Sequence, residues 1–147
     1  TEPSGEPANR ARNDNDKRFT RGRFEFGGEQ RSYKLYVPSG LVDGQRPLIV
    51  MLHGCTQTPD DFARGTRMNV LAQETGALVL YPAQAVRSNR SKCWNWFQPA
   101  DQHRGAGEPA MLAALTRHIV EGHAVDPRRV HAAGLSAGGA MAAILGR

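Results

Sequence analysis

Three short runs of mainly apolar residues, each bounded by turn-forming residues, stand out along the chain. They are too short to cross a membrane but have the length of a β-strand. Because the apolar residues follow one another instead of alternating with polar ones, each run fits a strand buried on both faces of a sheet. The predicted strands cover residues 47–52, 77–81 and 130–135.

Helical patterns separate these strands. Met111, Leu115 and Ile119 recur every four residues and form one apolar stripe, as in a helix that packs against a core. The predicted helices cover residues 60–74, 109–122 and 137–145. Strands that alternate with helices predict an α/β protein, in which helices cover both faces of a mostly parallel sheet.

The N-terminal part of the chain has a different pattern. Apolar and polar residues alternate in 23–26 and in 33–37, and a Gly-Gly pair between them favours a turn. We therefore expect a β-hairpin that adds antiparallel strands at one edge of the sheet. Residues 1–18 lack apolar periodicity and are rich in Pro, Gly, Asn, Asp and Arg, which predicts a flexible arm. Residues 19–147 are expected to belong to a single domain.

The composition narrows the possible partners. With 39% hydrophobic and 22% charged residues, 147 residues are enough for one domain with an apolar core and too few for two. The formal net charge is +5, but the basic residues are spread along the chain and interleaved with acidic ones. We therefore expect no nucleic-acid partner. No apolar run approaches the roughly 18 residues of a membrane-spanning helix, so no membrane partner is expected either.

The segment from Gly134 to Gly138 carries candidate chemistry, because it matches the G-x-S-x-G pattern around Ser136. In this pattern a serine occupies a strained turn between a strand and a helix, and the flanking glycines avoid collisions with neighbouring backbone. The match falls where a predicted strand ends and a predicted helix begins, which is the context the pattern requires. We interpret Ser136 as the nucleophile of an α/β-hydrolase; the alternative is a serine that only caps a helix.

A serine that attacks an ester needs fixed donors for the negative charge that develops on the carbonyl oxygen. His53-Gly54-Cys55 follows the first buried strand, where α/β-hydrolases place their second oxyanion loop. The expected oxyanion hole therefore consists of the backbone N–H groups of Cys55 and Ala137. A histidine in this loop is expected to brace the turn and not to act as the base. Gln57 is either an exposed polar residue or a support for the same loop.

Two cysteines match neither a metal-ligand spacing nor a CxxC motif. In the usual strand order of this fold, the loops after the first two buried strands are neighbours, so we expect a disulfide between Cys55 and Cys93. It would hold Trp94, Asn95 and Trp96, which lie in the long loop 83–107, beside the oxyanion hole as a wall for substrate. The alternative is that the tryptophans cover the core and both thiols are free.

Four segments in this order resemble the polyhydroxybutyrate depolymerase family of esterases, and the likeness covers most of residues 23–147. They are Tyr33-Lys-Leu-Tyr-Val-Pro38, His53-Gly-Cys-Thr-Gln57, Lys92-Cys-Trp-Asn-Trp-Phe97 and Gly134-Leu-Ser-Ala-Gly-Gly139. The resemblance implies a secreted or periplasmic serine esterase that cuts a polyester such as poly(3-hydroxybutyrate), or its oligomers, through an acyl-enzyme at Ser136. The ester hydrolysis that it implies requires no metal and no cofactor.

Two other functions remain open. Members of the family resemble feruloyl and acetylxylan esterases, so a carbohydrate ester is an alternative substrate. A catalytically inert binding module is the second alternative, in which the basic arm and a basic cluster hold a polyanion or a surface. That cluster consists of Arg87, Arg90 and Lys92.

One departure from the family pattern concerns the catalytic acid and base. The family order is Ser, then Asp, then His, whereas this chain stops at Arg147, shortly after Ser136. Four further histidines precede the serine: His118, His123 and His131 lie on or beside elements whose burial or solvation explains them, whereas His103 in the long loop could approach the cleft as a base. We expect the triad Asp and His, and the rest of the sheet, on a C-terminal remainder of the same enzyme that packs as a second polypeptide against the strand at 130–135. Proteolysis, a disordered gap or a split chain would each explain the end at Arg147.

Overall fold

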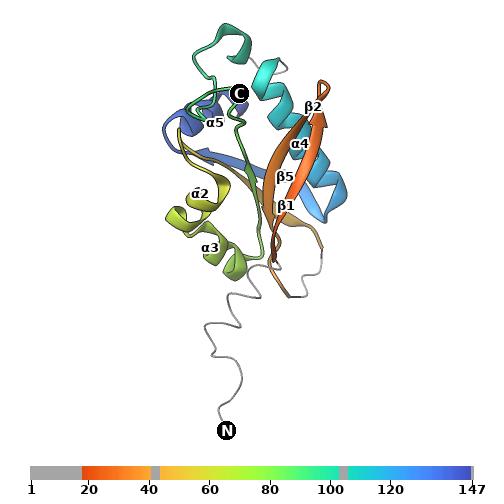
Figure 1. Ribbon diagram of the computed structural model, residues 1–147. Helices are drawn as coiled ribbons and strands as arrows, with labels where there is room; N and C mark the ends of the chain where they lie inside the picture. Colours follow the sequence, from red (N-terminus) through yellow and green to blue (C-terminus); the bar gives the residue numbers. More distant parts are fainter. Residues whose placement is uncertain (1–17, 41–43, 103–105, 147) are drawn as a thin grey trace.

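A five-stranded mixed sheet forms the centre of the protein, with helices on both faces (Figure 1). The computed structural model describes residues 18–40, 44–102 and 106–146. The strand order is β1-β2-β4-β3-β5. The predicted flexible arm and His103 lie outside the described residues, except for Arg18. The predicted α/β architecture with an antiparallel hairpin at one edge is confirmed.

The hairpin consists of β1 (Phe19–Phe26) and β2 (Glu29–Tyr36), which pair antiparallel. Gly27 and Gly28 form the turn with φ angles of 60° and 81°, the left-handed conformation that a two-residue hairpin turn requires. Both strands are longer than the alternation of apolar residues predicts. The reason is that β1 lies at the edge of the sheet, where polar side chains reach solvent without breaking the backbone ladder.

The three predicted strands are β3 (Arg46–Leu52), β4 (Leu78–Pro82) and β5 (Val125–Gly134). Burial is confirmed for β4 and most of β3, but the prediction that the third strand is buried on both faces is wrong: β5 is largely exposed from residue 127 onward, because it lies at an edge of the described sheet. β3 pairs in parallel with both β4 and β5, while β2 joins the group antiparallel to β4. Regular pairing of β5 with β3 runs from Val130 to Gly134, close to the predicted strand 130–135, but the strand extends back to Val125 across a register shift. β5 pairs on one side only, so a proline without an N–H fits there, and a register shift accommodates it.

The helix predicted for residues 60–74 is two helices, α2 (Pro59–Thr66) and α3 (Met68–Thr75). Arg67 between them has a φ of 56°, and its N–H closes α2 by donating to the carbonyl of Ala63. Thr58 begins α2 with a capping box. The other helical segments are η1 (Pro99–Asp101), α4 (Gly107–Gly122) and α5 (Ala137–Leu145).

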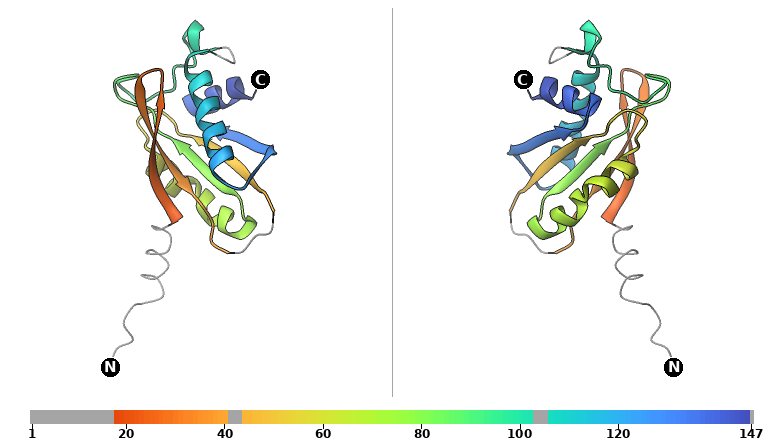
Figure 2. Two further views of the ribbon diagram at one scale, coloured as in Figure 1. Left: turned by 90° about the vertical axis from the view of Figure 1, so that its right-hand side faces the viewer. Right: turned by 90° about the vertical axis from the view of Figure 1, so that its left-hand side faces the viewer.

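The helices form one layer on each face of the sheet (Figure 2). α4 and α5 cover the face that holds the larger apolar cluster, which includes Leu48, Leu80, Leu115 and Met141. α2 and α3 cover the other face, where Phe62 and other apolar residues pack on the sheet. Within the described residues, no helix is long and apolar enough to cross a membrane. Strands β3 and β5 end side by side, because Leu52 pairs with Gly134, and the loops that follow these strands build the candidate site.

Candidate active site

Ser136 occupies a sharp turn between the end of β5 and the start of α5. Its φ and ψ angles are 57° and −121°, a conformation that residues other than glycine rarely adopt and that costs about 1–3 kcal/mol. The N–H of Gly138 donates to the carbonyl of Leu135 at 3.0 Å and closes the turn. The residue is exposed, as a nucleophile must be. This is the strand-turn-helix geometry that the G-x-S-x-G pattern predicts.

Two glycines make this turn possible. A Cβ atom at position 134 would overlap the backbone carbonyl of Gly138, and one at position 138 would overlap the backbone oxygens of Leu52 and His53. These obstacles are backbone atoms, so no side chain could move aside to make room. The requirement for glycine at position 134 therefore follows from contact within the elbow, and the requirement at position 138 from contact between the elbow and the end of β3.

The oxyanion loop, residues 53–57, follows β3 and lies against the elbow. The N–H of Leu135 donates to the carbonyl of Leu52 at 3.3 Å, which joins the ends of β3 and β5. Gln57 supports the loop, because its Oε1 accepts the N–H of Gly54 at 2.7 Å. Among the described residues, neither the N–H of Cys55 nor that of Ala137 donates a hydrogen bond, so both are available to an oxyanion.

His53 is a buried structural residue of this loop, with an exposed fraction of 1%. Its Nδ1 lies 2.7 Å from the carbonyl oxygen of Gly54, and its Nε2 accepts the N–H of Gln84 at 3.1 Å. Burial lowers the pKa of the imidazole, and the positive charge of Lys92 lowers it further. With both ring nitrogens occupied by backbone groups, His53 braces the loop, as its position in the sequence predicts.

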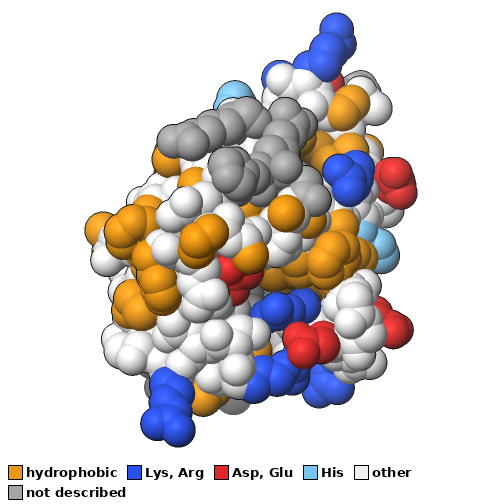
Figure 3. Space-filling view, turned by 90° about the horizontal axis from the view of Figure 1, so that it is seen from above, with side chains coloured by type: hydrophobic (Ala, Val, Ile, Leu, Met, Phe, Trp, Pro, Cys, Tyr) orange, Lys and Arg blue, Asp and Glu red, His pale blue; other side chains and the backbone are white. Residues whose placement is uncertain are grey.

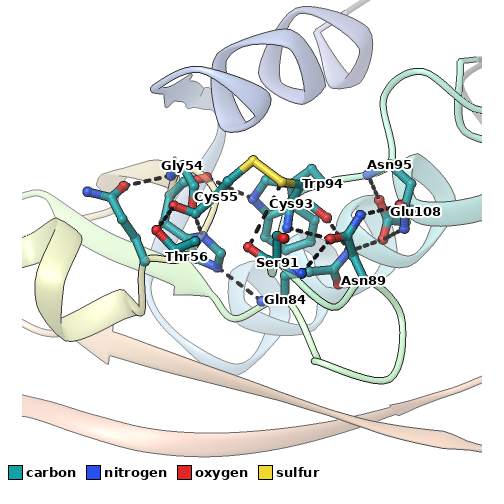
Figure 4. Close-up of a disulfide and its surroundings, with 12 residues drawn as sticks. Gly54, Cys55, Thr56, Gln84, Asn89, Ser91, Cys93, Trp94, Asn95 and Glu108 are labelled. Atoms are coloured by element: carbon teal, nitrogen blue, oxygen red, sulfur yellow. Dashed lines mark hydrogen bonds between the residues drawn. A yellow bond between two sulfur atoms is a disulfide. The ribbon is translucent and has the colours of Figure 1, made fainter.

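A disulfide joins Cys55 to Cys93 and links the oxyanion loop to the segment after β4 (Figure 4). The main chain reinforces this link, because the N–H of Thr56 donates to the carbonyl of Ser91 at 2.6 Å. The alternative of two free thiols is therefore excluded for this structure. The loop that carries Trp94 is thus attached to the oxyanion loop, as we expected.

The expected substrate contact of Trp94 and Asn95 does not agree with the structure. The exposed fraction of Trp94 is 0%, and its indole Nε1 donates to the carbonyl of His53 at 3.1 Å. Asn95 is also buried, with its side chain bonded to Glu108 and Ser88. Both residues are correctly placed near the oxyanion loop but face inward, because their polar atoms satisfy buried backbone and carboxylate groups.

Trp96 is the part of the expected aromatic wall that reaches solvent. Its exposed fraction is 44%, and its ring packs edge-on against that of Phe97 with centroids 6.1 Å apart. Figure 3 shows the molecule from above the view of Figure 1. On this face, groups of apolar side chains lie between basic and acidic ones. A substrate-binding role for Trp96 stays a prediction.

Sequence reasoning missed the anchor of this region, which is the buried carboxylate of Glu108 at the start of α4. It accepts the backbone N–H of Asn95 at 2.6 Å and the side-chain amide of the same residue at 3.1 Å, and it is also bonded to the amide of Gln84 (Figure 4). Burial raises the pKa of Glu108, against the effect of these donors. An acidic residue in a first helical turn is common, so the sequence carries no signal for this network.

Two further histidines lie away from the elbow. His118 is on α4, with its ring 5.2 Å from that of Phe24 in the hairpin. His131 lies in β5, opposite Ile49 of β3 and several residues before Ser136. Neither follows the carboxyl end of a strand, where this fold places its base. The source of the catalytic base stays a prediction.

A serine elbow at the carboxyl end of a sheet with parallel central strands and helices on both faces defines the α/β-hydrolase fold, of which the structure contains a part. The solved acetyl xylan esterase from Aspergillus awamori has this fold: it superposes with a TM-score of 0.73 at 22% identity, covering 86% of this chain and 46% of that one. The family described as esterase PHB depolymerase matches residues 31–147. The chain belongs to this family, which confirms the resemblance found in the sequence.

Curated relatives carry three kinds of name: depolymerase, feruloyl esterase and acetylxylan esterase. Poly(3-hydroxyalkanoate) depolymerase C of Paucimonas lemoignei is 38% identical over 110 residues, which are 75% of this chain and 26% of that protein. Feruloyl esterase B of Thermothelomyces thermophilus is 32% identical over 120 residues, which are 80% of this chain and 40% of that protein. The chain thus spans between about a quarter and two-fifths of the length of these relatives.

Proposed function

We propose that the chain provides the nucleophile and the oxyanion hole of a serine esterase. The hydroxyl oxygen of Ser136 attacks the ester carbonyl, its proton passes to a base, and the alcohol leaves as the acyl-enzyme forms. The N–H groups of Cys55 and Ala137 stabilise the oxyanion, and water then releases the acid and restores the serine. The observation that carries this proposal is the left-handed backbone of Ser136 in the elbow.

The catalytic acid and base belong, in this proposal, to a C-terminal remainder of the same enzyme that packs against β5 as a second polypeptide. Two observations support this site. Within the part of the chain that the structure describes, β5 is paired on one side only, and it is largely exposed from residue 127 onward. A hollow of about 520 Å³ lies beside it, lined in part by Val120, Val130 and Leu145. We refer to both polypeptides together as the assembled enzyme.

The proposed substrate is a polyester such as poly(3-hydroxybutyrate) or its oligomers. The name and identity of the depolymerase relative from Paucimonas lemoignei support this choice, and Trp96 with Phe97 offers an exposed apolar contact for a polymer segment. The feruloyl esterase relative favours a carbohydrate ester as the second candidate. A disulfide fits an oxidising compartment, so we propose that the enzyme is secreted or periplasmic.

Covalent labelling of the assembled enzyme with a fluorophosphonate tests the nucleophile. We expect one probe per enzyme on Ser136, no labelling of Ser136→Ala, and a loss of about 10⁶-fold in kcat for that variant. Ser32→Ala, at an exposed position in β2, is the matched control and should label normally. Labelling of Ser136→Ala would assign the nucleophile to another residue, and no labelling of the wild type would favour the inert binding module.

A panel of substrates tests the second part of the proposal. Release of soluble product from 3-hydroxybutyrate oligomers, with little reaction of feruloyl or acetyl sugar esters, is the expected result. The reverse pattern would assign the enzyme to the carbohydrate esterases.

A further inference from the structure

We propose that His53 is a positioning residue for the oxyanion hole: its ring holds the carbonyl of the peptide unit whose N–H is the Cys55 donor, and the main chain of Gln84 fixes the ring in the tautomer that can do so. This inference rests on the proposed function, because it assigns a role within the same site. It concerns a residue that does not itself touch the substrate.

The geometry of one peptide unit carries the argument. The carbonyl of Gly54 and the N–H of Cys55 belong to the same planar trans peptide, in which the two groups point in opposite directions. His53 Nδ1 lies 2.7 Å from the oxygen of Gly54. A hydrogen bond to that oxygen fixes the rotation of the whole plane, so the N–H of Cys55 is held on the opposite side, away from His53.

The hydrogen-bond chemistry of the ring allows one neutral tautomer. The backbone N–H of Gln84 can only donate, so Nε2, at 3.1 Å from it, must be the unprotonated acceptor. The carbonyl of Gly54 can only accept, so the proton must be on Nδ1. The other tautomer, and the doubly protonated ring, would each place an N–H of the ring against the N–H of Gln84.

The surroundings leave the imidazole and the loop little freedom. The ring of Trp94 lies 5.3 Å from the His53 ring, and its indole donates to the carbonyl of His53. The side-chain amide of Gln84 donates to the carbonyl of Cys93 at 3.0 Å and to Glu108. On the other side of Gly54, Gln57 holds the N–H of the preceding peptide unit. Side chains therefore hold both peptide units that flank Gly54, and the main-chain N–H of Gln57 adds a longer hydrogen bond of 3.3 Å to the oxygen of Gly54.

Two substitutions in the assembled enzyme separate positioning from packing. His53→Phe keeps an aromatic ring against Trp94 but removes both hydrogen bonds, whereas His53→Asn keeps a side-chain N–H that can reach the carbonyl of Gly54. Removal of one oxyanion donor costs about 10²–10³-fold in kcat. We expect His53→Phe to lose about 10²-fold in kcat with KM changed less than about twofold, and His53→Asn to recover most of that loss.

The proposal is overturned if His53→Phe keeps its kcat, if the loss is mainly in KM, or if His53→Asn is as poor as His53→Phe. A ¹⁵N NMR measurement of the wild-type imidazole decides the tautomer without catalysis and without a variant that must fold: Nδ1–H is expected, and Nε2–H would contradict the proposal. If the wild type shows the expected tautomer but hydrolyses no ester and is not labelled at Ser136, the proposed function has failed instead.

Discussion

The two loops that meet at Ser136 are held in place by different means. The oxyanion loop is braced by side chains: a disulfide, the imidazole of His53 and the amide of Gln57. The elbow is held by backbone alone, because Gly134 and Gly138 pack directly against carbonyl groups. The geometry of the oxyanion loop is therefore sensitive to substitutions that remove side-chain atoms, whereas that of the elbow is sensitive to the addition of a single carbon atom. This difference yields distinct predictions for each half of the site.

The largest effect is expected from removing the disulfide with Cys55→Ser and Cys93→Ser together. The bridge closes a loop with a sequence separation of 38, for which the loss of chain entropy in the unfolded state predicts a stabilisation of about 4 kcal/mol. The free energy of unfolding, measured in urea, should fall by about that amount. A fall below about 1 kcal/mol would mean that hydrogen bonds hold the loop without the bridge, namely those of Glu108 and those that join Asn89 to Cys93 and Asn95.

Addition of one methyl group tests the elbow. Gly138→Ala places a Cβ atom on the backbone oxygen of Leu52, so β3 and α5 must separate, at a cost of about 3 kcal/mol in the free energy of unfolding. Fluorophosphonate labelling of Ser136 in the assembled enzyme should also slow. Gly65→Ala is the matched control, because nothing lies within 4 Å of its Cβ and its φ is ordinary for a helix. That variant should be neutral or slightly more stable.

The same contrast explains what could be predicted from the sequence. The elbow could be found because its requirement for glycine on both sides of Ser136 leaves a pattern in the letters. The bracing of the oxyanion loop leaves none: the burial of Trp94 and the carboxylate of Glu108 depend on contacts between segments far apart in the chain. The break between α2 and α3 at Arg67 could not be predicted for a similar reason: the positive φ of Arg67 leaves no local signal in the sequence when the residue is not glycine.

The strands were predicted where burial on both faces imposes an unbroken apolar run, as in β3 and β4. The prediction was too short at the start of β5, which begins at Val125, before Pro127, and not at residue 130. A proline is excluded from a central strand but not from an edge, and whether a strand lies at an edge is a property of the whole sheet. The local sequence therefore could not decide between a turn and an edge strand.

The smallest expected effect, and the one that best isolates the bracing side chains, is the pH dependence of stability. Burial lowers the pKa of His53 in the folded chain, so the unfolded chain binds its proton first as the pH falls. The contribution of neutral His53 is fully present above the ordinary histidine pKa of about 6.5 and is lost as the pH falls through the lower folded value. Its slope is at most about 1.4 kcal/mol per pH unit.

Glu108 acts with the opposite sign. Burial raises its pKa, so its contribution to the free energy of unfolding is present below the ordinary glutamate pKa of about 4.3 and is lost as the pH rises through the folded value.

Urea unfolding between pH 7.5 and 5 tests the contribution of His53. The substitution His53→Asn should remove the part of the stability curve that falls with acid, while His123→Asn, at the exposed end of α4, should leave the curve unchanged. Equal curves for the wild type and His53→Asn would mean that the imidazole gains a proton without disturbing Gln84, and the bracing of the oxyanion loop would then not depend on the tautomer.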